Sequence, residues 1–267
     1  MSKQPLVPPF GDSIKLADFA ADYTGGVSRQ EALALIPSLR TRLNELQDEV
    51  YAGKQHAVLV LLQAIDTGGK DGTIKSVFQE VGPLGCSVTS FGVPTPEELA
   101  HDYLWRYRQP MPERGQLVIF NRSYYESVLV ERVREIAPND IWKRRYEEIN
   151  TLEAYLAREG TVVLKFFLHI SNGEQRERLQ ARIDDPRKRW KFELGDLDDR
   201  KRWDSYQDAF QDMINRCNTK AAPWHIVPAD HKWYRDVTVA GAIIKRLEGL
   251  EMEFPKAAPG VEGLRVK

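Results

Sequence analysis

A glycine-rich segment between a strongly apolar run and an amphipathic stretch most constrains how this chain can fold. Residues 57–62 are entirely apolar, residues 64–73 contain three glycines and Lys70, and the amphipathic stretch begins at Thr73. A buried strand that turns into a helix through such a loop gathers backbone N–H groups and a helix N-terminus around one point. With the Lys70 ammonium beside them, these groups can bind phosphate. The sequence therefore predicts a phosphate-binding loop at the end of a buried strand.

The loop departs from the common pattern G-x-x-x-x-G-K-[ST] in two places. Ala64 stands where the first glycine belongs, and Asp71 stands where the Mg²⁺-binding hydroxyl belongs. Asp66 lies inside the loop, and a carboxylate beside phosphates is unfavourable unless a divalent cation lies between them. We therefore predict Asp66 as a Mg²⁺ ligand, with Mn²⁺ as an alternative ion. The competing interpretation is a glycine-rich turn whose aspartate only caps the next helix.

Composition and charge limit the remaining classes of protein. The 267 residues carry a formal net charge of -1, so the chain is not a basic nucleic-acid binder, and any polyanion it handles requires a local cluster of basic residues. Two distant cysteines give neither a disulfide framework nor a metal site and suit a reducing cytosol. No apolar run reaches membrane-spanning length, and residues near Met1 lack the charged-then-apolar pattern of a secretion signal, so none is expected. We predict a soluble, cytoplasmic protein without a membrane partner.

Apolar runs alternate with helical patterns along the chain, which predicts an α/β fold with a parallel sheet covered on both faces. A helix is expected from the Ser28 cap to about Ala52. Residues 1–24 show no strong period and are expected to wrap the surface or to pair with a neighbouring subunit. The tail after Phe254 is expected to be loose. The expected strands lie at 57–65, 86–91, 116–120, 162–168 and 225–228.

A polar cluster follows the third predicted strand. Asn121 stands where many phosphate-loop enzymes carry an acidic metal-positioning residue, and its amide can orient a metal-bound water or a phosphate oxygen. The Arg122 guanidinium can reach phosphate, and Glu126, one turn further on, can supply the missing negative charge and a second metal contact. The alternative for Asn121 is a simple helix N-cap.

A basic helix follows the fourth predicted strand. Arg178 and Arg182 are four residues apart on one face, and a second basic run carries Arg189 and Lys191. Like charges at this spacing repel each other. The chain tolerates this repulsion either because the side chains are solvated and paired with nearby acids, or because an anion binds between them. We favour the anion and predict a lid that folds over phosphates.

Three of these segments, taken in order, resemble the polyphosphate kinase 2 family. The loop at 66–74 matches that family's phosphate loop, and residues 188–192 match its lid signature Lys-Arg-Trp-Lys. The second motif of the family often reads Asp-Arg-Ser-Trp-Tyr-Asn-Arg, whereas this chain has Asn121 for the first Asp and Glu126 for the later Asn. That departure looks like the subgroup that accepts both AMP and ADP (class III).

The resemblance implies a three-layer α/β/α sandwich of the P-loop kinase type, related to thymidylate kinase. It implies a single domain over 1–267, with an N-terminal extension at 1–27 and a helical lid at 172–205, that assembles as a homo-oligomer, a dimer or a tetramer. The implied reaction is Mg²⁺-dependent transfer of a terminal phosphoryl group from inorganic polyphosphate to AMP or ADP, giving ADP or ATP. The alternatives are an ATP-dependent nucleoside monophosphate kinase and a non-catalytic nucleotide or polyphosphate sensor.

Motifs and resemblance together predict two sets of site residues. The predicted catalytic residues are Asp66, Lys70, Asn121, Arg122 and Glu126. The predicted phosphate- and nucleotide-binding residues are Thr67, Gly68, Gly69, Asp71, Gly72, Thr73, Arg178, Arg182, Arg189 and Lys191.

Overall fold

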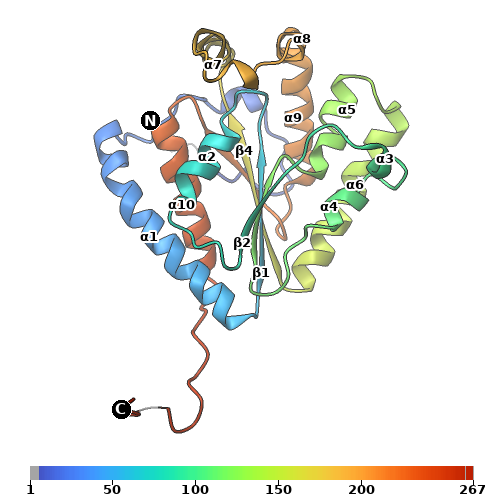
Figure 1. Ribbon diagram of the computed structural model, residues 1–267. Helices are drawn as coiled ribbons and strands as arrows, with labels where there is room; N and C mark the ends of the chain where they lie inside the picture. Colours follow the sequence, from blue (N-terminus) through green and yellow to red (C-terminus); the bar gives the residue numbers. More distant parts are fainter. Residues whose placement is uncertain (1–5, 262, 267) are drawn as a thin grey trace.

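A five-stranded parallel sheet forms the centre of the computed structural model, which describes residues 6–261 and 263–266 (Figure 1). The strand order is β2-β3-β1-β4-β5, and every neighbouring pair is parallel. This arrangement confirms the predicted α/β class. The strands are β1 (Ala57–Gln63), β2 (Cys86–Ser90), β3 (Leu117–Asn121), β4 (Thr161–His169) and β5 (Trp224–Pro228).

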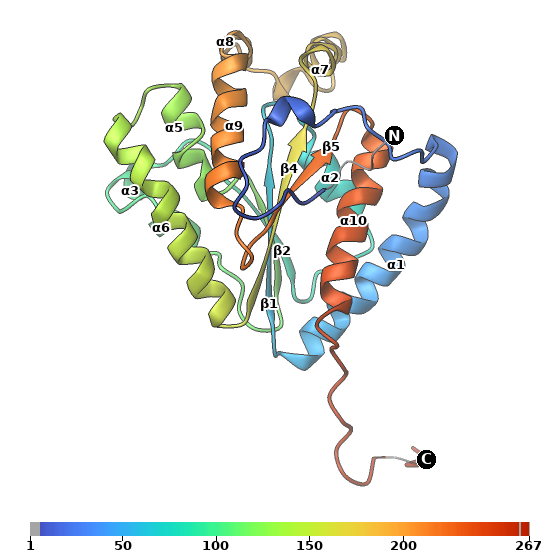
Figure 2. The same cartoon turned by 180° about the vertical axis from the view of Figure 1, so that it is seen from behind.

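Helices cover both faces of the sheet, which is why its central strands are almost entirely buried. All seven residues of β1 are buried. One face is covered by α1 (Arg29–Gly53), α2 (Lys70–Val77) and α10 (Lys232–Glu248), and the other by α6 (Asn139–Arg158) and α9 (Trp203–Cys217) (Figures 1 and 2). These are the three layers that the family resemblance implied.

The remaining elements are short or lie at the top of the molecule in Figure 1. The short helices α3, α4 and α5 follow β2 and β3, and α7 and α8 make up most of the predicted lid. Their bounds are α3 (Pro96–Leu99), α4 (Trp105–Arg108), α5 (Val130–Val133), α7 (Asn172–Asp184) and α8 (Gly195–Lys201), with 3-10 helices η1 (Leu16–Asp18), η2 (Tyr124–Ser127) and η3 (Arg189–Lys191).

Local capping explains where several elements begin. Ser28 forms a capping box with Glu31 and starts α1, as predicted. Helix α2 begins at Lys70 rather than at Thr73, because Gly69 adopts φ 105° as its N-cap and the Thr73 N–H already donates to the Gly69 carbonyl at 2.9 Å. The phosphate loop therefore runs straight into the first turn of a helix.

The N-terminal extension wraps the molecule's own surface. The Ile226 N–H of edge strand β5 donates to the Leu6 carbonyl at 2.7 Å, the Ile14 N–H donates to Asn215 Oδ1 on α9 at 2.8 Å, and the Asp230 N–H donates to the Ala21 carbonyl at 3.1 Å. This confirms the first of the two expectations for residues 6–24, while residues 1–5 lie outside the described part. The described tail after Phe254 is exposed, has neither helix nor strand, and leads away from the body (Figure 1).

No helix within the described ranges combines the length and apolar character needed to cross a bilayer.

Candidate active site

The predicted motifs meet at the carboxyl edge of the sheet. The phosphate loop follows β1, Asn121 ends the adjacent β3, and α7 follows β4 on the other side of β1. A cavity of about 700 Å³ opens there, between the loop, the ends of β2 and β3, and the segment from α7 to α8. Parallel α/β folds bind ligands at this edge.

The loop holds its lysine close to the end of β1. Thr67 adopts φ 66°, and the Gly68 N–H donates to the Ile65 carbonyl at 2.9 Å. The Lys70 Nζ donates to the Ala64 carbonyl at 2.9 Å, and its side chain is buried. Burial, with a further effect of Arg122, lowers the pKa of Lys70 to about 8. The loop thus presents a cation whose desolvation a bound anion would offset.

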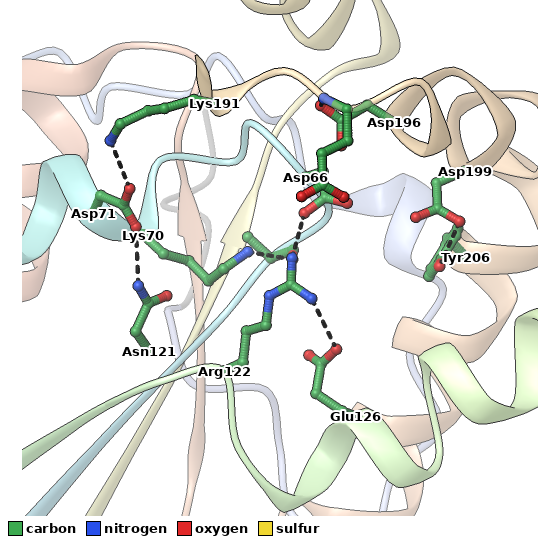
Figure 3. A network of polar contacts seen from close by, with 12 residues as sticks. Asp66, Lys70, Asp71, Asn121, Arg122, Glu126, Lys191, Asp196, Asp199 and Tyr206 are labelled. Atoms are coloured by element: carbon green, nitrogen blue, oxygen red, sulfur yellow. Dashed lines mark hydrogen bonds and ion pairs between the residues drawn. The ribbon is translucent and has the colours of Figure 1, made fainter. Parts of the chain in front are cut away.

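Arg122 lies between two carboxylates (Figure 3). Its guanidinium is 2.7 Å from Asp66 Oδ1 and 3.6 Å from Glu126 Oε2. Burial acts to raise the pKa of Asp66, but the Arg122 and Lys70 cations outweigh it and hold that pKa below its ordinary value. Burial raises the pKa of Glu126 above its ordinary value, although the Arg122 and Lys70 cations both act to lower it. Four predicted catalytic residues therefore form one connected charged cluster.

Asn121 is the last residue of β3 and does not cap the following helix. Ser123 caps η2, since its hydroxyl accepts from the Tyr125 N–H, so the N-cap alternative for Asn121 is wrong. The Asn121 Nδ2 donates to Asp71 Oδ1 at 2.9 Å, and its Oδ1 is buried without a hydrogen-bond partner in the described part of the chain. Asp71 also accepts from Lys191 Nζ at 3.0 Å, which ties the lid to the first turn of α2.

The other predicted lid residues differ in where they point. Arg182 lines the cavity, with its Nη1 3.7 Å from Asp196 Oδ2. Arg178 also lines the cavity, but its Nη1 donates to backbone carbonyls of the loop. Arg189 donates to the Ile183 carbonyl at 2.7 Å and is not among the described residues that line the cavity. Contact of Arg189 with phosphate is therefore not supported by this arrangement.

Several cavity residues were not predicted from the sequence. Arg134, after α5, is paired with the buried Asp199 of α8, while Lys232 and Arg235 enter from the start of α10. Asp196 of α8 faces Asp66 (Figure 3), and burial and the Asp66 charge both raise its pKa. Each of these contacts joins elements that are distant in sequence, so no local motif marks them.

The residues at the centre of the site suit a hard divalent cation. Asp66 and Asp196 offer carboxylate oxygens, and the unpartnered Asn121 oxygen offers a further acceptor. No group of three or more His, Cys, Asp or Glu side chains in the described ranges could hold a metal ion by itself. The facing Asp66 and Asp196 carboxylates fit Mg²⁺, which is usually bound through one or two carboxylates together with water and substrate phosphates.

Fold and site together define a P-loop protein of the kinase-like α/β class. Comparison with known proteins identifies the family within this class. Residues 26–255 match the model of the family described as polyphosphate kinase 2. The chain is 51% identical over 250 residues to the AMP/ADP-polyphosphate phosphotransferase of Meiothermus ruber, covering 94% of this chain and 93% of that protein.

A second relative and a solved structure agree with this match. The chain is 42% identical over 244 residues to the ADP-polyphosphate phosphotransferase of Rhodopseudomonas palustris, covering 87% of this chain and 84% of that protein. The crystal structure of polyphosphate kinase 2 from Arthrobacter aurescens TC1 superposes with a TM-score of 0.91 at 40% identity, covering 96% of this chain and 92% of that chain. The chain belongs to the polyphosphate kinase 2 family, and the predicted resemblance is confirmed.

Proposed function

We propose that this protein is a Mg²⁺-dependent phosphotransferase that moves the terminal phosphoryl group of inorganic polyphosphate to AMP or ADP, giving ADP or ATP. The observation that carries the proposal is the charged cluster at the edge of the sheet, in which Arg122 lies between Asp66 and Glu126 beside Lys70. The M. ruber relative, named for AMP, ADP and polyphosphate, supports both acceptors.

The charge of the cavity supports a polyanionic donor. Nine cationic side chains line it against four carboxylates, although the whole chain carries a net charge of -1. A cavity of one sign of charge raises the local concentration of the opposite ion. This concentration of positive charge fits a substrate with about one negative charge per phosphate unit, a charge density comparable to that of nucleic acids.

The reaction needs positioning and charge stabilisation more than proton transfer. An oxygen of the nucleotide's terminal phosphate attacks the terminal phosphorus of the polymer, a new P–O bond forms, and the shortened polymer leaves with the electron pair of the broken P–O bond. Because the terminal phosphate group of AMP or ADP is largely ionised at pH 7, no base has to remove a proton from the acceptor. Lys70 and Arg122 lie where they can neutralise the charge of the group in transfer.

Asp66 is the proposed metal ligand, with Asp196 facing it and Glu126 as a further candidate. When bound, Mg²⁺ would neutralise phosphate charge and orient donor and acceptor oxygens. In this proposal the loop between Thr67 and Thr73 binds phosphate mainly through backbone N–H groups other than those of Gly68 and Thr73, which donate to the Ile65 and Gly69 carbonyls. Arg182 and Lys191 bind phosphate from the lid.

One assay separates this proposal from its alternatives. AMP or ADP is offered with long-chain polyphosphate or with ATP as the only donor, with Mg²⁺ present, and products are separated by chromatography. We expect ADP and ATP from polyphosphate. Robust use of ATP without use of polyphosphate would identify a nucleoside monophosphate kinase, and tight binding without product would identify a sensor.

Asp66→Asn tests the metal role. The variant keeps the volume of the side chain and removes its charge, and we expect kcat/KM to fall about a hundredfold because one preorganised electrostatic contact is lost. The exposed Asp208→Asn on α9 is the matched control and should retain activity. If Asp66→Asn folds and turns over like the wild type across a Mg²⁺ titration, Asp66 is not the metal ligand.

Assembly and location are separate proposals. We predict that the chain forms a single domain, that two or four copies assemble into a homo-oligomer, and that the protein is cytoplasmic. Light scattering after size-exclusion chromatography measures the number of chains directly.

A further inference from the structure

The Arg178 side chain lies beneath the phosphate loop with all of its donors engaged. A guanidinium carries five N–H groups. The Arg178 Nε donates to Glu174 Oε1 at 2.6 Å, its Nη1 donates to the Thr67 and Gly68 carbonyls at 3.1 Å each, and its Nη2 donates to the Ala229 and Asp230 carbonyls. With a side chain only 9% exposed, Arg178 has no free N–H directed at a ligand.

The two loop carbonyls that Arg178 binds are those whose direction decides whether the loop can hold an anion. A loop binds phosphate through its N–H groups only if its carbonyls point away from the ligand. Thr67 reaches such a conformation at φ 66°, which is costly for a residue other than glycine and persists only where surrounding contacts enforce it. Arg178 supplies such contacts for Thr67 and Gly68.

The other anchor of Arg178 is itself firmly held. The turn between β5 and α10 donates from the Asp230 N–H to the Ala21 carbonyl, and the Asp230 carboxylate accepts from the Ser171 N–H at 2.8 Å. The Ala229 N–H donates to the His169 carbonyl at 2.8 Å. Arg178 therefore connects the loop to a turn that is fixed by the N-terminal extension, by β4 and by the start of α7.

We propose that Arg178 is a positioning residue that holds the phosphate loop in its binding conformation through the loop carbonyls, rather than a direct ligand of phosphate. Its effect on turnover rests on the proposed function, whereas its effect on the loop does not. Lysine cannot replace it, because an ammonium offers three N–H groups from a single point instead of a planar fork. A direct phosphate ligand, in contrast, tolerates lysine, which is itself a common phosphate binder.

Arg178→Lys separates the two roles. Hydrogen exchange of the peptide covering residues 64–70 is measured in the unliganded protein, together with a reference peptide from α6. We expect exchange in the loop to become at least about tenfold faster while the reference peptide is unchanged, and kcat/KM with polyphosphate to fall about a hundredfold. Arg176→Lys, exposed on the same helix, should match the wild type in both measurements.

A second variant keeps the proposal testable if Arg178→Lys fails to fold. Glu174→Gln leaves the guanidinium in place but weakens the contact to Nε, and it should accelerate loop exchange by a smaller factor. Unchanged loop exchange in a folded Arg178→Lys protein, or acceleration spread equally over loop and reference, would overturn the proposal. If the wild type does not use polyphosphate, the exchange measurement still decides the role of Arg178.

Discussion

Two residues that line the cavity, Thr67 and Arg122, adopt positive φ values of 66° although neither is glycine. Such conformations are uncommon for residues with a Cβ and gather at functional sites. The Arg122 N–H donates to the Leu62 carbonyl of β1 at 3.1 Å, which fixes the turn and directs the guanidinium toward Asp66. The backbone at the ends of β1 and β3 therefore places opposite charges side by side before any ligand binds.

Gly69→Ala should disable the loop. Gly69 has φ 105°, and a Cβ there would lie 2.2 Å from Arg235 Nη1. Arg235 cannot easily retreat, because it is buried and bonded to Asp236 through Nε at 2.8 Å and Nη2 at 2.6 Å. We expect a loss of about 1–3 kcal/mol of stability from the backbone strain, and of about a hundredfold in kcat/KM from the displaced loop.

Gly26→Ala is the matched control for this variant. Gly26 also has a positive φ, 85°, but no atom of the described residues lies within 4 Å of a Cβ placed there. Thermal melting should show a similar strain in both variants, whereas only Gly69→Ala should lose turnover. Equal activity of the two variants would mean that the close approach of Arg235 to Gly69 is not required for turnover.

The pKa of Lys70, lowered to about 8 by burial and by Arg122, predicts an alkaline limit to activity. Below that pH the ammonium is charged and binds phosphate, and above it the charge is lost, so kcat/KM should fall as pH rises past about 8. Bound phosphates favour the charged form of Lys70. In the enzyme–substrate complex the alkaline decline of kcat should therefore occur at higher pH than the decline of kcat/KM.

The stability of the fold should not follow this loss of activity. The pKa of Lys70 in the folded protein lies below its ordinary value of 10.5, so between about pH 8 and 10.5 the unfolded chain binds more protons than the folded one. In that window the cost of burying the Lys70 charge is lost as pH rises, so Lys70 opposes folding less. Thermal melting recorded over the same pH range distinguishes titration of Lys70 from alkaline unfolding. If an active Lys70→Arg variant still loses activity above about pH 8, the titration belongs to another group.

Sequence patterns predicted the site residues that lie within one motif and missed those that arrive from elsewhere. Asp66 and Lys70 lie in the loop itself, and Arg122 follows an apolar strand, so each carries a local signal. Arg235 and Asp196 reach the site through packing of α10 and α8, and nothing in their neighbouring residues indicates this. Arg178 was predicted at the site, but the direction of its donors depends on contacts to four backbone carbonyls that no sequence pattern encodes.

At the scale of elements, the predicted lid at 172–205 is fixed to the body near both of its ends. Arg178 of α7 donates to the Thr67 carbonyl of the loop, and Asp199 of α8 is paired with Arg134 of the body. Arg200 of α8 joins the two lid helices by donating to Gln175 Oε1 of α7 at 2.8 Å. Between them lies an exposed stretch in which Trp190 is 78% exposed. We infer that closure over phosphates is confined to this middle part, about residues 182–194.

Lys191→Met tests the middle part of the lid. The Lys191–Asp71 pair is 36% and 62% exposed, and such surface pairs contribute little to stability. We therefore expect an unchanged melting temperature but an increase of about tenfold in KM for polyphosphate, because a cation facing the substrate is lost.

Lys201→Met is the control, since its pair with Asp198 is also exposed but lies outside the cavity lining. Steady-state kinetics at a fixed salt concentration measures both variants. An equal KM for Lys191→Met and the wild type would remove Lys191 from the binding surface.

The five strands were predictable, and two of the four-residue helices were not. Apolar runs gave all five strands to within about two residues, and the Ser28 cap marked the start of α1. The helices α4 and α5 have only four residues each, so they contain too few turns for a period to be visible.

At the scale of the whole molecule, the distribution of charge matters more than its sum. The chain has 38 Lys and Arg against 39 Asp and Glu, yet cations outnumber carboxylates nine to four around the cavity. The fold achieves this by bringing the starts of α2 and α10, the end of β3 and the lid to one edge of the sheet. A polyanion is therefore attracted to one place on a nearly neutral surface.

Binding of polyphosphate should consequently weaken steeply with salt. For a flexible single-stranded polyanion, the logarithm of affinity falls with a slope of about −0.7 per phosphate contacted. Four proposed contacts, from Lys70, Arg122, Arg182 and Lys191, therefore predict a slope of about −2.8 against the logarithm of salt concentration. Titrations without Mg²⁺, which itself binds polyphosphate, measure this slope. Arg182→Met should make the slope shallower by about 0.7, whereas Arg178→Lys should leave it unchanged, because its charge remains and its donors face carbonyls. A wild-type slope near zero would contradict the binding of polyphosphate along these cations.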